Sequence, residues 1–337
     1  MIILLFKLAF YLVLLHALWY AASRIITRRN PPSEREIKAF NQAEKDIFGL
    51  DAVKDILEQP TIRISGETVS LTILAREPGK PTLVFIPGTS VYAQLYTGFL
   101  KAMYDEGFNV VSFDPRGHGR SGGPRGDYTF GGIVDDALAV CAYARERFGD
   151  NVAIAGSSQG GMAAFYAAAR DNSLKAAVCH NLADLNGRDN LVLARFTMPA
   201  PLTPLALKVL DFYKDFAFPS ALYLDLTREF LPDGRDAAGF LRKDPLAVTW
   251  FTFRALRSLV MTPLPKPVEK ITVPVMVVHS DRDHIFPQDY VEDLYRRLSC
   301  PKEFLLLKDR EHLIMTNNVD EVAPSVAAWL KKTMEQA

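Results

Sequence analysis

The feature that most limits the possible folds is a series of short, uninterrupted apolar segments separated by stretches with helical periodicity. Strands with one solvent-exposed face alternate apolar and polar residues, so these segments indicate strands buried on both faces. Helices between such strands are typical of parallel crossovers. The segments are 82–86, 109–113, 152–155, 175–179, 273–279 and 304–307. The sequence therefore predicts an α/β fold with a mostly parallel, doubly wound sheet.

Two further regions complete the predicted domain. Segments 61–65 and 68–76 alternate apolar and polar residues around Gly66, which predicts an antiparallel hairpin and brings the sheet to about eight strands. Between residues 181 and 267 the alternation of strands and helices stops, and an insertion of this length predicts a helical cap over a site. The predicted core consists of the residues on either side of this cap, 61–180 and 268–337.

The N-terminal residues form a separate part. Residues 2–22 are apolar except for Lys7 and His16, and as a helix they span about 30 Å, the hydrocarbon thickness of a bilayer. We expect a single-pass transmembrane anchor that contacts the membrane through residues 1–22, and assign residues 1–30 to it and its basic flank. A cleaved signal peptide is the alternative, although it has a shorter apolar stretch.

The residues after the span bear on its orientation and on the next segment. Arg24, Arg28 and Arg29 favour a cytoplasmic body by the positive-inside rule, whereas Lys7 opposes it.

Residues 31–60 are predicted to be a juxtamembrane helical segment. Its helix begins at a capping box, in which Ser33 is followed three residues later by Glu36.

Charge and cysteine content exclude several classes of protein. The chain has 39 basic and 39 acidic residues, and this balance argues against a nucleic-acid-binding protein. Its three cysteines form no CxxC pair, and its histidines show no HExxH spacing. We therefore predict no metal, and leave a homodimer open.

The strongest chemical motif is Gly156-Ser-Ser-Gln-Gly-Gly161, which directly follows a predicted buried strand and precedes a helical run. This context is that of a nucleophile elbow. Glycines on either side of Ser158 permit a sharp, strained turn that lifts its hydroxyl clear of the sheet. Ser158 is therefore the predicted nucleophile, and the amide of Gln159 is one predicted oxyanion donor.

A serine nucleophile needs a histidine base and a carboxylate that orients it, in the chain order Ser, acid, His. His312 follows the last predicted strand and is the predicted base. Asp283 follows the preceding strand and is the predicted acid, with Asp281 as the alternative. The second oxyanion donor is expected in the loop after the first buried strand, at the amide of Thr89.

These motifs resemble the α/β-hydrolase superfamily, and within it the monoacylglycerol lipase and lysophospholipase-like group (serine aminopeptidase S33-type). The resemblance runs from about residue 61 to the C-terminus. The segment from Asp114 to Pro124 is similar to the group's Asp-x-Arg-Gly-His-Gly-x-Ser loop, which implies that His118 lies beside the nucleophile. Pro87 and Gly88 stand where many members have His-Gly, and Ser280 stands where many have Gly before the acid loop.

The resemblance implies hydrolysis of carboxylic esters through an acyl-enzyme, without a cofactor. Aromatic residues of the cap are expected to line an acyl site, together with Gly88; among them are Phe196, Phe212 and Phe216. With the anchor, this predicts a membrane-bound esterase acting on monoacylglycerols, lysophospholipids or similar acyl lipids. The alternatives are a short-chain carboxylesterase, thioesterase or peptidase with the same triad, and a non-catalytic membrane scaffold with this fold.

Overall fold

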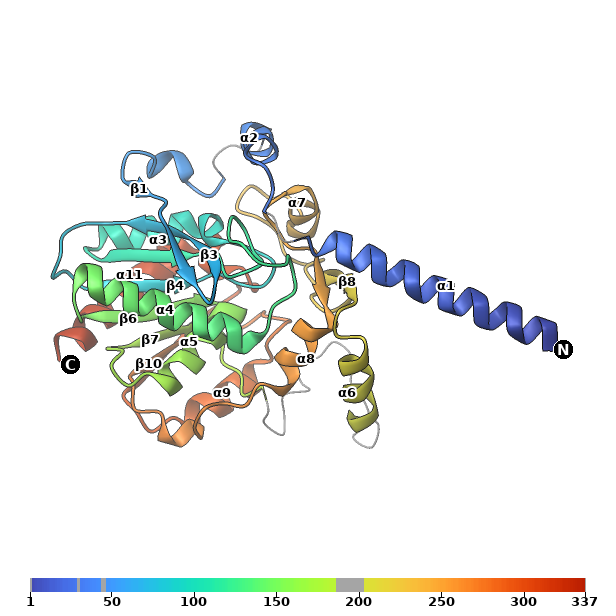
Figure 1. The fold of residues 1–337 in the computed structure, drawn as a ribbon. Helices are drawn as coiled ribbons and strands as arrows, with labels where there is room; N and C mark the ends of the chain where they lie inside the picture. Colours follow the sequence, from blue (N-terminus) through green and yellow to red (C-terminus); the bar gives the residue numbers. More distant parts are fainter. Residues whose placement is uncertain (1, 29–30, 44–46, 186–202, 337) are drawn as a thin grey trace.

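The computed structural model describes residues 2–28, 31–43, 47–185 and 203–336 (Figure 1). Within these residues the central sheet has nine strands in the order β1-β3-β5-β4-β6-β7-β10-β11, with β2 paired to β3. Its strands are β1 (Leu57–Glu58), β2 (Thr61–Ile64), β3 (Glu67–Leu74), β4 (Thr82–Ile86), β5 (Asn109–Phe113), β6 (Val152–Ser157), β7 (Ala177–His180), β10 (Val275–Ser280) and β11 (Lys302–Leu307).

The sheet is mostly parallel, as predicted. Neighbouring strands from β5 to β11 pair in parallel, whereas β1, β2 and β5 each pair with β3 in antiparallel register. The six apolar segments correspond to β4, β5, β6, β7, β10 and β11, and the predicted hairpin is β2–β3. The sequence analysis did not predict β1, which is only two residues long.

Two hydrophobic cores cover the two faces of the sheet. Within β4, Val84 and Ile86 join one core, whereas Leu83 and Phe85 join the other, since successive side chains of a strand point to opposite faces. The first core includes α4 (Phe130–Phe148), α5 (Gln159–Arg170) and α9 (Gln288–Arg297). The second includes α3 (Thr97–Asp105), α10 (Ile314–Asn317) and α11 (Val319–Glu335). Both faces are therefore buried, as the continuous apolar runs indicated.

The region between β7 and β10 contains more than helices. Its described α-helices are α6 (Thr203–Phe212), α7 (Ala237–Lys243) and α8 (Phe253–Met261). It also holds a small antiparallel sheet of β8 (Ala217–Pro219) and β9 (Trp250–Thr252), which the sequence analysis did not predict. Strands of three residues are too short to show alternation, so periodicity does not reveal them.

The N-terminal helix α1 (Ile2–Ile26) extends away from the core (Figure 1). Its stretch Lys7–Ile26 is long and apolar enough to cross a membrane, with a mean hydropathy of 1.5 and only 6% of that window buried. The helix α2 (Glu34–Ala43) begins at the predicted capping box, where the Ser33 N–H donates to Oε2 of Glu36 at 2.8 Å.

The last turns of α1 are attached to the cap. The indole Nε1 of Trp19 donates to the carbonyl oxygen of Ala217 in β8 at 2.9 Å, and the Ala217 N–H donates to Oγ of Ser23 at 2.9 Å. The ring of Phe216 lies 4.8 Å from both the Trp19 ring and the His16 ring, centroid to centroid. Polar and aromatic contacts therefore join this helix to the edge of the small cap sheet.

Candidate active site

Ser158 lies at the sharp turn between β6 and α5. Its φ of 55° and ψ of −118° place a non-glycine residue in a strained region of the backbone. The turn depends on the neighbouring glycines, because a Cβ on Gly156 would lie 2.1 Å from the carbonyl oxygen of Gly160. A Cβ on Gly160 would lie 2.1 Å from the carbonyl oxygen of Ile86. Both positions of the motif therefore require glycine, because the neighbouring backbone leaves no room for a Cβ.

The loops after β10 and β11 bring an acid and a base together. Nδ1 of His312 donates to Oδ2 of Asp283 at 2.7 Å, and the two side chains are 3% and 0% exposed. Oδ1 of Asp283 accepts the backbone N–H groups of Ile285 and Phe286 at 2.8 and 2.9 Å. Asp281 instead accepts the backbone N–H of Asp309 at 2.7 Å, so its carboxylate stabilises the loop after β11 and does not contact the imidazole through this bond.

A polar network that the sequence analysis missed supports this pair. Nδ2 of Asn181 donates to Oδ2 of Asp283 at 2.9 Å, and Nδ1 of His279 donates to Oδ1 of Asn181 at 2.6 Å. Asn181 has a positive φ of 74°, which asparagine tolerates better than most residues. It follows β7 directly, so its place at the end of a central strand was the available signal.

The electrostatics of the pair favour a charged acid and a basic imidazole. Burial by itself raises the pKa of Asp283, but the adjacent His312 outweighs burial and holds that pKa below its ordinary value. Burial by itself lowers the pKa of His312, yet the charge and hydrogen bond of Asp283 raise it above its ordinary value. Burial lowers the pKa of the neighbouring His180, which keeps that ring neutral.

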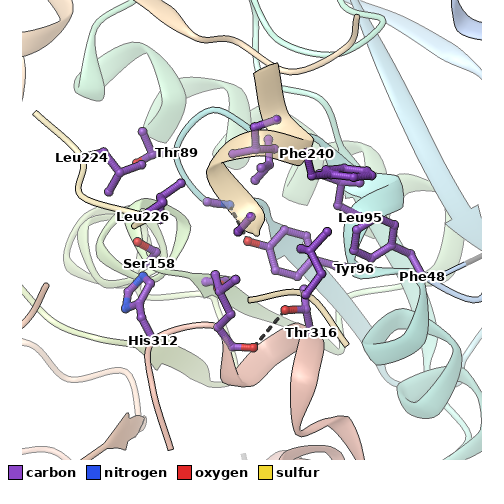
Figure 2. A pocket seen from close by; sticks show the side chains of 17 residues that line it. Phe48, Thr89, Leu95, Tyr96, Ser158, Leu224, Leu226, Phe240, His312 and Thr316 are labelled. Atoms are coloured by element: carbon purple, nitrogen blue, oxygen red, sulfur yellow. Dashed lines mark hydrogen bonds between the residues drawn. The ribbon is translucent and has the colours of Figure 1, made fainter. Parts of the chain in front are cut away.

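Ser158 and His312 both line one pocket, whose other walls are mostly apolar. Figure 2 shows Ser158 and His312 side by side, with Phe48 across the pocket from them. The free space measures about 60 Å³. The other lining residues are Gly88, Thr89, Val91, Leu95, Tyr96, Ser157, Leu224, Leu226, Leu231, Ala237, Phe240, Leu241, Leu313 and Thr316.

The two predicted oxyanion donors lie near Ser158. Thr89 lines the pocket with Ser158, and Gln159 is the first residue of α5, directly after it. The side-chain Nε2 of Gln159 donates to the hydroxyl of Tyr128 at 3.1 Å. Gly88 also lines the pocket, and a Cβ there would lie 2.9 Å from the Tyr96 hydroxyl, so a larger residue would require the Tyr96 side chain to shift.

The other predicted site residues lie farther away. His118 is buried, and its ring lies 4.9 Å from that of Tyr128. The hydroxyl of Tyr128 in turn accepts the hydrogen bond from Nε2 of Gln159. Phe212 and Phe216 are not among the pocket residues; they lie beside the His16 ring of α1, at 6.4 and 4.8 Å, and Phe212 is 73% exposed. Phe196 lies outside the described residues.

Two groups of described side chains bring metal-ligand atoms within 4.8 Å of one another: His180, Asp283 and His312, and Glu229, His284 and Glu311. In the first group, Asp283 and His312 are joined by their own hydrogen bond. In the second, both oxygens of Glu229 accept backbone N–H groups. Asp283, His312 and Glu229 are thus already hydrogen-bonded within the protein.

A serine elbow, a buried acid–histidine pair and a cap over the sheet edge define the α/β-hydrolase class. The chain belongs to the serine aminopeptidase S33 family, whose model matches residues 77–319. It is therefore a hydrolase enzyme, and the resemblance stated from the sequence is confirmed. A curated relative is the AB hydrolase superfamily protein YisY of Bacillus subtilis (strain 168), 26% identical over 68% of this chain and 84% of that protein.

Solved structures share the fold. A membrane phospholipase A, described as a bacterial virulence factor, is similar with a TM-score of 0.61 and 19% identity, over 98% of this chain and 99% of that chain. A monoacylglycerol lipase of Paleococcus ferrophilus has a TM-score of 0.61 and 21% identity, over 82% of this chain and 99% of that chain. At these identities, the likeness establishes the fold.

Proposed function

We propose that the protein is a membrane-anchored serine hydrolase that cleaves carboxylic esters of acyl lipids, such as monoacylglycerols or lysophospholipids. The observation that carries this proposal is the pocket, in which Ser158 and His312 meet apolar walls from the cap. Apolar walls suit an acyl chain, because burying each CH₂ stabilises binding by about 0.8 kcal/mol. The names of the lipase and phospholipase with the same fold support the same substrate class.

The proposed mechanism assigns a role to each of these residues. His312 removes the hydroxyl proton of Ser158, and the serine oxygen attacks the ester carbonyl. Asp283 holds the imidazole in the tautomer in which Nδ1 carries the proton and Nε2 can accept one. The amides of Thr89 and Gln159 stabilise the tetrahedral oxyanion, each contributing roughly 3–4 kcal/mol. His312 then protonates the leaving alcohol and activates the water that releases the acid.

The lining residues argue against the aminopeptidase activity that the family's description suggests. An aminopeptidase must hold a free α-ammonium group, for which a carboxylate in the pocket is the natural partner. Among the described residues that line the pocket, none carries a carboxylate. An ester with an apolar acyl group is therefore the better match.

The free volume supports a second candidate, a short-chain carboxylesterase. A space of about 60 Å³ corresponds to the liquid volume of roughly two water molecules. The space between the described lining residues is therefore a better match for a short acyl chain than for a long one.

One experiment separates these possibilities: hydrolysis of p-nitrophenyl esters of increasing acyl length by the full chain in detergent. Ser158→Ala should abolish turnover, whereas the control Ser325→Ala, at a half-buried serine on α11 outside the pocket, should not. A rate that rises with chain length supports the lipid substrate, and a short-chain optimum supports the carboxylesterase. Hydrolysis that survives Ser158→Ala would refute the nucleophile, and no turnover of any ester would favour a thioesterase, a peptidase or a scaffold.

The anchor is part of the proposal. The stretch Lys7–Ile26 is long, apolar and almost unburied. Arg24 lies in its last turn and Arg28 follows it, which favours a cytoplasmic body. Washing membranes with alkaline carbonate should leave the full chain in the membrane pellet. Release of an N-terminally shortened protein would instead indicate a cleaved signal peptide.

A further inference from the structure

One segment of the cap, residues 224–231, both lines the pocket and is hydrogen-bonded to the loops of the acid–histidine pair. Three of its side chains, Leu224, Leu226 and Leu231, line the pocket. Its polar groups contact the two core loops that carry Asp283 and His312. The wall of the acyl pocket and the support of these loops therefore belong to the same stretch of chain.

The central contact is made by Glu229, whose side chain is only 1% exposed. Its Oε1 accepts the backbone N–H of His312 at 3.3 Å, and its Oε2 accepts the backbone N–H of Leu313 at 3.2 Å. Burial of a carboxylate is costly unless hydrogen bonds compensate, and here both bonds are to the residue that carries the imidazole and its neighbour.

Two further hydrogen bonds join the segment to the core. Nδ2 of Asn317 donates to the carbonyl oxygen of Phe230 at 2.7 Å. Nε2 of His284, which follows Asp283 in the chain, donates to the carbonyl oxygen of Asp225 at 3.1 Å. The segment is therefore bonded to both loops of the acid–base pair.

We propose that Glu229 is a positioning residue of the hydrolase. From the cap, it fixes the backbone of His312, while Asp283 orients the imidazole from the core. The inference rests on the proposed role of His312 as the base. Glu229 acts through the backbone and takes no part in proton transfer.

The test compares Glu229→Gln with a matched control, Asp233→Asn. Glutamine has nearly the same shape, but it is neutral and presents an NH₂ group to one of the two backbone donors. Asp233 is a nearby cap carboxylate that pairs with Arg235 at 2.6 Å, within the cap itself. Both variants are measured as the full chain in detergent, with a short-chain p-nitrophenyl ester over a range of pH.

For Glu229→Gln we expect kcat to fall roughly 10- to 100-fold, the loss that misplacement of a reacting group by about 1 Å produces, with little change in KM. The acid limb of the pH profile should move to lower pH, because a negative charge near His312 is removed. The other titratable groups around His312 are Asp283, His180 and His279, and Nδ1 of His284 lies 3.4 Å from Oε1 of Glu229; the substitution alters none of these four side chains. Asp233→Asn should behave like the unsubstituted protein.

Glu229→Gln with unchanged kcat and an unchanged acid limb would overturn the inference, as would a loss shared equally by Asp233→Asn. If Glu229→Gln does not fold, Asn317→Ala replaces it, since Asn317 is exposed and its side chain reaches the same segment. A severalfold loss of kcat then supports the proposal, and an unchanged kcat refutes it. Failure of the proposed function would be seen separately, as an unsubstituted chain without Ser158-dependent hydrolysis.

Discussion

The two sides of the pocket are built differently. On the core side, Ser158, Asp283 and His312 follow three strands of the sheet, and backbone contacts or hydrogen bonds hold each of them. On the cap side, the walls are apolar side chains such as Leu226 and Phe240. Directional bonds fix a reaction geometry, whereas apolar contacts set only size and shape. Chemistry and substrate size should therefore respond to different substitutions.

The largest expected effect is on the core side. Asp283→Asn should lower kcat by about 10⁴-fold, because the wrong imidazole tautomer then faces Ser158. Since Asp283 raises the pKa of His312, the residual activity should have its acid limb at lower pH. A pH–rate series checks both. The matched control is Asp281→Asn, which should keep nearly full activity; a comparable loss there would make Asp281 the acid.

The elbow glycines give the next effect, on folding. Gly160→Ala should lower the free energy of unfolding by about 3 kcal/mol or more, because the new methyl group meets the Ile86 carbonyl oxygen at 2.1 Å. Gly131→Ala is the control, because a Cβ there meets nothing within 4 Å. Thermal unfolding measures both variants. Equal stability of the two would mean that the elbow is not tightly packed.

On the cap side, Phe48→Ala should change specificity and not chemistry. Phe48 lies at the far end of the pocket and stacks edge-on against Phe240, with ring centroids 5.6 Å apart (Figure 2). Its removal should raise the preference for longer over shorter acyl chains on the order of tenfold. The ratio of kcat/KM values for two ester lengths measures it. Phe212→Ala, outside the pocket, should leave that ratio unchanged, and a change there instead would transfer the acyl site to α6.

The smallest effect is expected where α1 meets the cap. Ser23→Ala removes the acceptor of the Ala217 N–H and should lower the free energy of unfolding by about 1 kcal/mol. Thermal unfolding in detergent measures the loss, with Ser325→Ala as control. No difference between the two variants would mean that this contact contributes nothing to stability.

The sequence predicted the core well, because its signals are local. Continuous apolar runs located the strands, and Gly156 and Gly160 located the elbow through the close backbone contacts that they permit. Chain order then pointed to His312, and to Asp283 with Asp281 as the alternative. The structure places Asp283, and not Asp281, against the imidazole.

The cap and its contacts could not be predicted in the same way. The sequence allows Phe212 and Phe216 to line an acyl pocket or to form the cap's own core equally well, and the structure places them beside α1. Glu229 and Asn181 lie in no motif; their partners are distant in sequence and become neighbours only when the loops fold. Phe48 belongs to the predicted juxtamembrane segment, whose relation to the pocket depends on tertiary packing.

The contact between α1 and β8 has a mechanical consequence. Trp19 and Ser23 bind both the oxygen and the N–H of Ala217, so the helix and the edge of the small sheet move as one body. With α1 in a bilayer, as proposed, a thinner membrane tilts the helix further, because its apolar length is fixed. That tilt would rotate the cap edge with it. The thickness of the host membrane thus becomes a variable that acts on the edge of the cap.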